Sequence, residues 1–166
     1  MATEFPDRIT QTIGALVRRE TEARILAPLI GALGDEFGRE KVVAILRRVI
    51  ENLARQQGRE LAAEFGSGPD AFLETLQFWT RGGALEIDLR VQTGTTLDFD
   101  VTRCRYAEMY RALGLADLGA VLSCNRDSAL IEGFDPNAAL RRDQTIMEGA
   151  RTCTFRYTFT RDAQTP

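Results

Sequence analysis

The chain has 166 residues and a formal net charge of -3, with 44% hydrophobic and 27% charged residues. This length suits one domain, placed here at residues 1–166, which can bury a sizeable core without disulfides. The acidic balance and the scattered arginines exclude the basic stripe that nucleic-acid binding needs. No apolar run approaches the roughly 20 residues that span a bilayer, so membrane insertion is excluded as well.

The amino-terminal sequence and the rare residue types indicate the compartment and the available chemistry. The first residues lack a basic segment followed by an apolar core, so no secretory signal is expected and a cytoplasmic location is predicted. Three cysteines are an odd number, which favours free thiols over a disulfide framework. Histidine is absent, which leaves acid-base chemistry to carboxylates, thiols or tyrosine. We expect no cofactor.

Residues 1–82 have the periodicity of helices, and the first helix is expected over about residues 9–26. Pro28 should kink or break this helix, because proline removes a backbone hydrogen bond and clashes with the preceding turn. The apolar stripe of the first helix consists of Ile9, Ile13, Leu16 and Val17.

The longest helix should cover residues 39–65, with a bend or an end near Gly58. A further helix should run from Pro69 to Thr80, since proline suits the first turn of a helix. The stripe expected to face the core in the longest helix consists of Val42, Leu46, Val49 and Leu53.

Residues 83–160 change from a helical period to alternation. Apolar and polar residues alternate over residues 85–92 and again over residues 97–102, which predicts an antiparallel hairpin turned at residues 93–96. Short helices are expected just after Cys104, over residues 115–122 and over residues 128–134. A second hairpin should follow, with strands at residues 140–147 and 152–160. In its last strand one face should hold Cys153, Phe155, Tyr157 and Phe159.

The order of these elements predicts an α+β fold: an antiparallel sheet of about four strands in two hairpins, covered by a helical amino-terminal half. Residues 83–160, which hold the sheet and the short helices, also hold all three cysteines. The candidate site is therefore expected there.

Cys124 and Asp127 form a C-x-x-D step that suits nucleophilic or acid-base chemistry. A cysteine attacks only as its thiolate, and neighbouring arginines such as Arg126, Arg103 or Arg105 would favour that form. The end of a helix before Cys124 would oppose it, because the carboxyl terminus of a helix disfavours an anion. Two other interpretations stay open: small buried hydrophobes, or a metal site built from the three thiols.

Arg142 and Thr145 offer a forked guanidinium and a hydroxyl suited to a small carboxylate. In a regular strand over residues 140–147 these two side chains point to opposite faces. Joint binding of one carboxylate would therefore require a bulge or a twist in that strand.

Three stretches carry a resemblance to a known family. They are Cys104-Arg105-Tyr106-Ala107-Glu108, the run from Leu113-Gly114 through Leu122-Ser123-Cys124-Asn125-Arg126-Asp127, and Arg142-Asp143-Gln144-Thr145 followed by Glu148-Gly149 and Cys153-Thr154-Phe155-Arg156. In this order they resemble the L-2-amino-thiazoline-4-carboxylic acid hydrolase family over about residues 101–157. The matching positions are Cys104, Cys124, Asp127, Arg142, Thr145, Gly149, Cys153 and Phe155. An acidic residue commonly follows the last cysteine in the family, and this chain has Thr154 there.

The resemblance implies a hydrolase that opens a five-membered cyclic amidine, giving a carbamoyl-cysteine in the type member. We hypothesise that Cys124 attacks the amidine carbon or that Asp127 activates water to do so, while Cys104 or Glu148 handles the departing nitrogen. Arg142 and Thr145, beside Cys153, would hold the carboxylate of a small-molecule substrate. The alternatives are a non-catalytic small-molecule-binding or thiol-sensor domain, and a cysteine metal site. A homo-oligomer is also left open.

Overall fold

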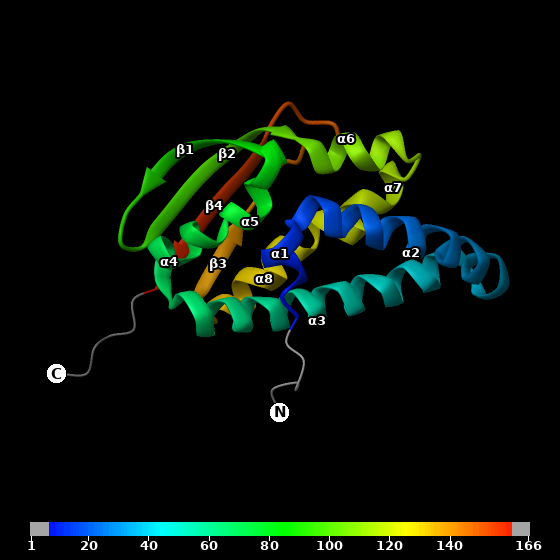
Figure 1. Ribbon diagram of the computed structural model, residues 1–166, viewed down its shortest axis with the longest axis horizontal. Coiled ribbons are helices and arrows are strands. Elements are labelled where there is room, and N and C mark those ends of the chain that lie inside the picture. Colours follow the sequence, from blue (N-terminus) through cyan, green and yellow to red (C-terminus); the bar gives the residue numbers. More distant parts are fainter. Residues whose placement is uncertain (1–6, 161–166) are drawn as a thin grey trace.

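The computed structural model describes residues 7–160, which form a four-stranded antiparallel sheet with helices packed against it (Figure 1). The sheet order is β1-β2-β4-β3. Its strands are β1 (Leu85–Gln92), β2 (Thr96–Cys104), β3 (Ala138–Arg141) and β4 (Cys153–Phe159). The predicted α+β class, with about four strands and a helical first half, is confirmed.

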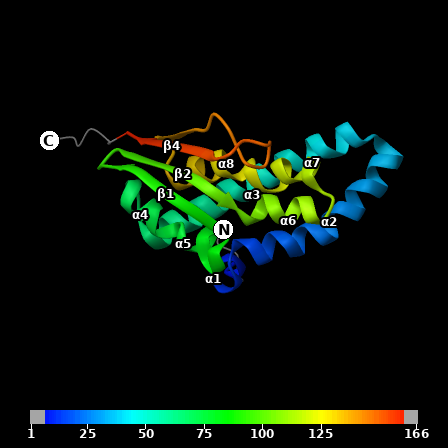
Figure 2. The same cartoon turned by 90° about the horizontal axis from the view of Figure 1, so that it is seen from above.

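The helical half begins with α1 (Ile9–Ile13), α2 (Ala15–Phe37) and α3 (Arg39–Phe65). Figures 1 and 2 show α2 and α3 as a long helical hairpin that extends past the end of the sheet. The break predicted at Pro28 is wrong, because α2 runs through this residue. Pro28 is exposed, so the carbonyl that loses its amide partner can be hydrated. The chain breaks at Gly14 instead, where φ is +82°.

The predicted apolar stripes of α2 and α3 match the buried faces only in part. Leu16, Val42 and Leu46 pack against the core, but Val17 is 52% exposed and Val49 is 49% exposed. The buried face of α2 consists of Ala15, Arg19, Ala23 and Ile30, and that of α3 of Ile50, Ala54, Gly58 and Leu61. Alanine and glycine thus occupy buried positions that the predicted stripes left out. Among residues 7–160 no helix is long and apolar enough to cross a membrane.

Of the bend or end expected near Gly58, the end does not occur, because α3 continues to Phe65. Gly58 lies against α8 (Arg126–Phe134), where a β-carbon on Gly58 would come within 2.7 Å of the Phe134 nitrogen. A β-carbon on Gly133 would come within 2.7 Å of the Arg55 carbonyl carbon. The two glycines thus let the backbones of α3 and α8 touch, and this contact holds α8 under the sheet.

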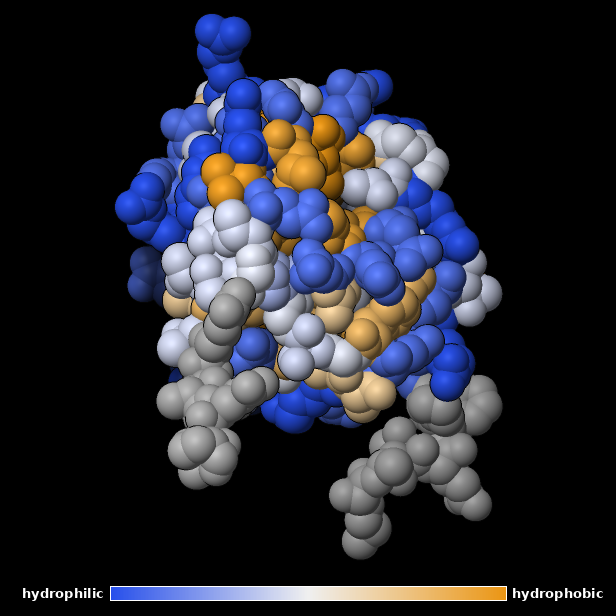
Figure 3. All heavy atoms as spheres, turned by 90° about the vertical axis from the view of Figure 1, so that its left-hand side faces the viewer, coloured by the Kyte–Doolittle hydropathy of each residue, from blue (hydrophilic) through white to orange (hydrophobic). Residues whose placement is uncertain are grey.

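The first hairpin is confirmed as β1 and β2, which pair in antiparallel register. It follows α4 (Gly68–Thr75), α5 (Gln77–Thr80) and a 3₁₀ turn, η1 (Arg81–Gly83). Leu97, Phe99 and Val101 of β2 point into the core as predicted, each no more than 2% exposed. The edge strand β1 exposes Leu89 and Val91. Figure 3 shows the end of the molecule that holds this hairpin, where apolar side chains reach the surface between polar ones.

After β2 the chain forms α6 (Arg105–Ala112), α7 (Ala116–Gly119) and a π-helical turn, η2 (Ala120–Cys124), which runs into α8. The helix predicted over residues 115–122 thus ends in a wider turn. π-helical turns inside helices are often found at functional sites. Here the turn carries Ser123 and Cys124 toward the space between the helices and the sheet.

The strand predicted over residues 140–147 is wrong, because β3 ends at Arg141 and residues 142–152 form a loop. This loop turns early: the amides of Glu148 and Ala150 both donate to the carbonyl oxygen of Thr145. It is held to β4 by a bond from the Asp143 amide to the Thr154 hydroxyl. The objection that Arg142 and Thr145 face opposite sides of a strand therefore does not apply.

Candidate functional site

A cavity lies between the sheet and the helices, in two adjoining lobes with water-accessible volumes of about 60 and 50 Å³. The sulfur lobe is lined by Val101, Cys104, Tyr106, Ser123, Cys124, Arg142, Thr145, Met147 and Cys153. The aromatic lobe is lined by Phe72, Leu76, Ile87, Phe99, Leu130 and Tyr157. Both lobes share Arg19, Trp79, Leu85, Arg126, Asp127 and Phe155. Side chains from helices, strands and the loop over residues 142–152 thus meet around one space.

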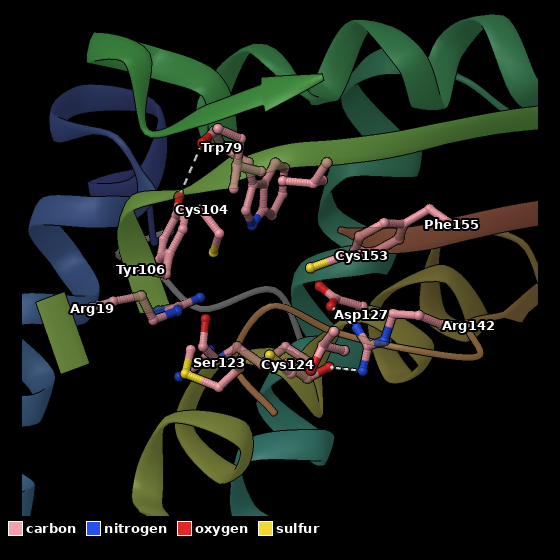
Figure 4. Close-up of a pocket in the computed structure, with 15 residues that line it drawn as sticks. Arg19, Trp79, Cys104, Tyr106, Ser123, Cys124, Asp127, Arg142, Cys153 and Phe155 are labelled. Carbon is pink, nitrogen blue, oxygen red and sulfur yellow. Dashed lines mark hydrogen bonds and ion pairs between the residues drawn. The ribbon is translucent and has the colours of Figure 1, made fainter. Parts of the chain in front are cut away.

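The three cysteines meet at the sulfur lobe, as Figure 4 shows, although they lie far apart in the sequence. Cys104 comes from the end of β2, Cys124 from η2 and Cys153 from the start of β4. Burial raises the pKa of all three thiols, that of Cys153 to about 11. The carboxylate of Asp127 raises the pKa of Cys124 further, while Arg142 only partly opposes it. The cysteines are therefore protonated thiols near neutral pH, which weakens the case for a cysteine nucleophile.

Asp127 and Arg142 form an ion pair at the wall of the sulfur lobe (Figure 4). Arg142 also donates from Nη2 to the carbonyl oxygen of Cys124 at 3.1 Å, and its guanidinium lies 5.5 Å from the ring centroid of Phe155. Burial raises the pKa of Asp127 above its usual range, although the charge of Arg142 opposes this rise. Asp127 is therefore a carboxyl that can take up and release a proton closer to neutral pH than an exposed aspartate.

Thr145 and Glu148 bind each other. The Thr145 hydroxyl donates to Glu148 Oε2 at 2.7 Å and accepts from the Glu148 amide at 3.2 Å. Thr145 lines the sulfur lobe, whereas Glu148 is exposed and lines neither lobe. Glu148 contacts the cavity only through its bonds to Thr145. Arg142 and Thr145, which were expected to hold the carboxylate of a substrate, each bind a carboxylate of the protein itself.

Sequence reasoning missed a second charged cluster, formed by Arg19, Arg126 and Glu22. Arg19 and Arg126 are 2% and 5% exposed, and both line both lobes. Glu22 Oε2 accepts from Arg19 Nη1 at 2.8 Å and from Arg126 Nη2 at 3.0 Å. The available signal was the position of Arg19, four residues from Ala15 and four from Ala23, on a face of small residues. A charge in such a stripe points into the protein.

Metal binding was an open interpretation for the cysteines. Within residues 7–160, no group of three or more cysteine, aspartate or glutamate side chains is arranged to hold a metal ion. The three sulfurs thus share a cavity without the arrangement of a ligand set.

A family model described as L-2-amino-thiazoline-4-carboxylic acid hydrolase matches residues 18–157. The matched span contains every residue that lines either lobe. The chain belongs to this family. Of the positions on which the resemblance depended, all but Gly149 line the sulfur lobe. Gly149 has a φ of +101° and shapes the turn that presents Thr145 and Met147 to the cavity.

A solved structure is similar in part to this chain. It is the crystal structure of the phenol-responsive sensory domain of the transcription activator PoxR with phenol. The sequence identity is 12% and the TM-score 0.48, over 81% of this chain and 72% of that one. No curated protein sequence matches the chain.

Proposed function

We propose that this domain hydrolyses a carbon-nitrogen bond of a small cyclic amidine such as 2-amino-thiazoline-4-carboxylate, with Asp127 as the base that activates water. The observation that carries the proposal is the position of Asp127. Its carboxyl lies at the wall of a cavity in a family of hydrolases, held by Arg142 and surrounded by protonated thiols. A general base needs access to water, which the cavity gives, and burial raises the pKa of Asp127 from its usual range toward the working pH.

Two partly buried carboxyls, Asp127 in the cavity wall and Glu22 bound to two arginines of that wall, have opposite pKa shifts, which supports different roles for them. Burial alone would raise the pKa of Glu22, but the guanidiniums of Arg19, Arg126 and Arg18 lower it below the usual range. Burial raises the pKa of Asp127. Carboxyls whose environments separate their pKa values are typical of sites where one stays ionised and the other transfers protons. Glu22 is then a fixed charge and Asp127 the proton carrier.

The proposed reaction needs only water as the second reactant. The Asp127 carboxylate takes a proton from a water molecule as the water oxygen bonds to the amidine carbon. The ring nitrogen of the tetrahedral intermediate takes this proton from Asp127. The new hydroxyl then passes its own proton through Asp127 to the same nitrogen, while the carbon-nitrogen bond breaks and the carbonyl forms. The water oxygen thus becomes the carbonyl oxygen of the product, both water hydrogens end on nitrogen, and Asp127 returns to its starting form. Cys104, a thiol in the same lobe, is a second candidate donor to that nitrogen.

Arg142 acts here as a positioning residue. Its bonds to Asp127 and to the Cys124 carbonyl fix the carboxyl at the wall of the lobe. The sulfurs of Cys124 and Cys153 then shape an apolar wall rather than attack the substrate. The Cys153 sulfur accepts a bond from the Ile146 amide at 3.2 Å, which ties the loop to the sheet.

The test compares substitutions at Asp127 and Cys124 in an assay of ring opening of 2-amino-thiazoline-4-carboxylate. D127N should lower kcat by about 10²-fold or more, because an amide cannot accept the proton. D143N, an exposed aspartate of the neighbouring loop, is the control and should keep full activity. In the wild type, kcat/KM should rise with pH through a pKa above the usual aspartate value of about 3.9.

C124A separates the two nucleophile hypotheses. Activity within about tenfold of the wild type is expected, since the buried thiol contributes shape and not charge. A loss as large as that of D127N would assign the attack to the Cys124 sulfur and would refute a water-based mechanism.

Non-catalytic small-molecule binding is the second candidate function. It is favoured by the raised thiol pKa values and by the aromatic lobe, which adds a largely apolar binding surface to the cavity. Saturable binding with no consumption of any cyclic amidine, in both the wild type and D127N, would support this candidate over the hydrolase.

A further inference from the structure

One carboxylate, that of Glu22, pairs with three guanidiniums, two of which line the cavity. Glu22 accepts from Arg18 at 2.8 Å in addition to Arg19 and Arg126. Arg18 has a second acidic partner in Asp7, but Arg19 and Arg126 have no other carboxylate among their ion pairs within residues 7–160. Arg19 and Arg126, the two most deeply buried arginines of the cavity, thus share the negative charge of Glu22.

Arg126 also has a donor without a partner. Its Nε donates to the Leu122 carbonyl at 2.8 Å and its Nη2 to Glu22, whereas Nη1 is buried and has no hydrogen-bond partner in the part of the chain that the structure describes. A buried donor without an acceptor costs the full desolvation of that group, and more so on a charged group. Because Arg126 lines both lobes, an anionic occupant of the cavity would lie beside this incompletely paired guanidinium.

The charges at the cavity also leave room for an anion. Three guanidiniums line it, those of Arg19, Arg126 and Arg142. The balancing carboxylates are Asp127, which pairs with Arg142, and Glu22. Burial and the nearby charge of Arg19 lower the pKa of Arg126 to about 9, as expected for a guanidinium short of negative partners. One further negative charge would balance the site.

The aromatic lobe adjoins this pair and indicates what the rest of the ligand is. Its own lining is hydrocarbon apart from the Tyr157 hydroxyl, with Phe72 and Phe99 among its aromatic rings. The ring of Phe99 stacks on Phe155, with centroids 4.9 Å apart, and Phe155 belongs to both lobes. Such a wall favours a flat apolar group.

We infer that Arg19 and Arg126 form an anion-binding subsite for the carboxylate of a small ligand whose apolar, flat portion fills the aromatic lobe. The ligand class is then a carboxylate attached to a flat ring, with the ring in the aromatic lobe and the charge at Arg19 and Arg126. The inference rests on the proposed function in placing the ligand in the same cavity, but it requires no turnover.

Trp79 provides the measurement. It is the single tryptophan of the chain and lines both lobes, so its fluorescence reports occupancy of the cavity. The probes are benzoate, its uncharged analogue benzamide, and acetate, which has the charge without the ring. Benzoate should change the Trp79 fluorescence saturably, and each of the other two should need at least about tenfold higher concentration, a difference of about 1.4 kcal/mol.

Two substitutions at Arg126 and one control locate the subsite. R126M should lose the preference for benzoate over benzamide, and R126K, which keeps the charge without the fork, should retain part of it. The control is R24M, on the same helix as Arg19, whose guanidinium pairs with Glu20 at the surface. R24M should keep the wild-type preference.

Equal binding of benzoate and benzamide by the wild type would overturn the inference without any variant, and so would the absence of binding by either. A benzoate preference that survives in a folded R126M would overturn the assignment to Arg126. The hydrolase proposal fails separately: ring opening that is undiminished in D127N refutes Asp127 as the base, whatever the benzoate preference is.

Discussion

The two ends of α8 contrast. Near its carboxyl end, Gly133 and Phe134 pack against α3 with no space between the backbones. In its first turn, Arg126 and Asp127 are charged, face a cavity, and leave a guanidinium nitrogen without a partner among residues 7–160. One end follows the rules of a close-packed core and the other departs from them. Departures of this kind are expected where a protein binds or reacts, because stability alone would remove them.

The contrast also assigns a task to each part. The glycine contact with α3 fixes the height of α8 below the sheet. That height decides how far Asp127 and Arg126 reach into the cavity. A dry, rigid contact at one end of a short helix therefore holds charged groups in place at the other.

The largest expected effect comes from breaking the dry end with G133V. The new side chain would overlap the Arg55 backbone, and neither helix can move without losing its packing. We expect a loss of about 3 kcal/mol or more in the free energy of unfolding, measured by urea denaturation.

G31A is the matched control for that substitution. Gly31 lies inside α2, where an added β-carbon would meet no other segment of the protein within 4 Å. Alanine there should stabilise the protein by about 0.5–1 kcal/mol through helix propensity. A G133V protein as stable as the wild type would show that α8 is not held by close contact with α3.

A smaller effect is expected from E22Q, which removes the charge shared by three guanidiniums. Removing this charge leaves the buried guanidiniums without a compensating carboxylate. Because Glu22 is itself partly exposed, the cost is reduced, and we expect a loss of about 2 kcal/mol in the free energy of unfolding at neutral pH.

The sign with pH follows from the pKa of Glu22, which is lowered in the fold. The stabilisation by Glu22 is present above its unfolded pKa of about 4.3 and is lost as the pH falls through the folded value. The difference between wild type and E22Q in urea denaturation should therefore shrink in acid. A difference that does not change with pH would show that the arginines do not stabilise the charge of Glu22.

Most of the fold could be predicted from the sequence because strand alternation and helix periodicity are local signals. The inward face of β2 followed in this way from Leu97, Phe99 and Val101. The buried faces of α2 and α3 could be predicted only in part, because they also carry alanine and glycine at close helix contacts, while larger residues such as Val17 and Val49 are exposed. Close approach depends on the partner helix, which no local pattern contains.

The candidate site was predictable to a similar degree. The resemblance singled out the cysteines, Asp127 and Arg142, and the structure brings them together at one cavity. Gly149 is the first glycine after Leu140, so a strand was expected to continue to Met147, whereas β3 ends at Arg141 and the chain already turns at Thr145. Arg19 was missed because Arg126, which shares Glu22 with it, belongs to another helix and reaches Glu22 only in the folded chain.

The smallest expected effect on stability is the most informative about the charged end of α8. R126M should lower the free energy of unfolding by less than about 1 kcal/mol or should raise it. Glu22 keeps Arg18 and Arg19 as partners, and the unpaired Nη1 is gone. Methionine fills a similar length without a charge. Urea denaturation of R126M beside G133V checks this directly. Equal destabilisation by both would make Arg126 a structural residue. A stable R126M that no longer prefers benzoate would mean that the charge of Arg126 serves ligand binding and not stability.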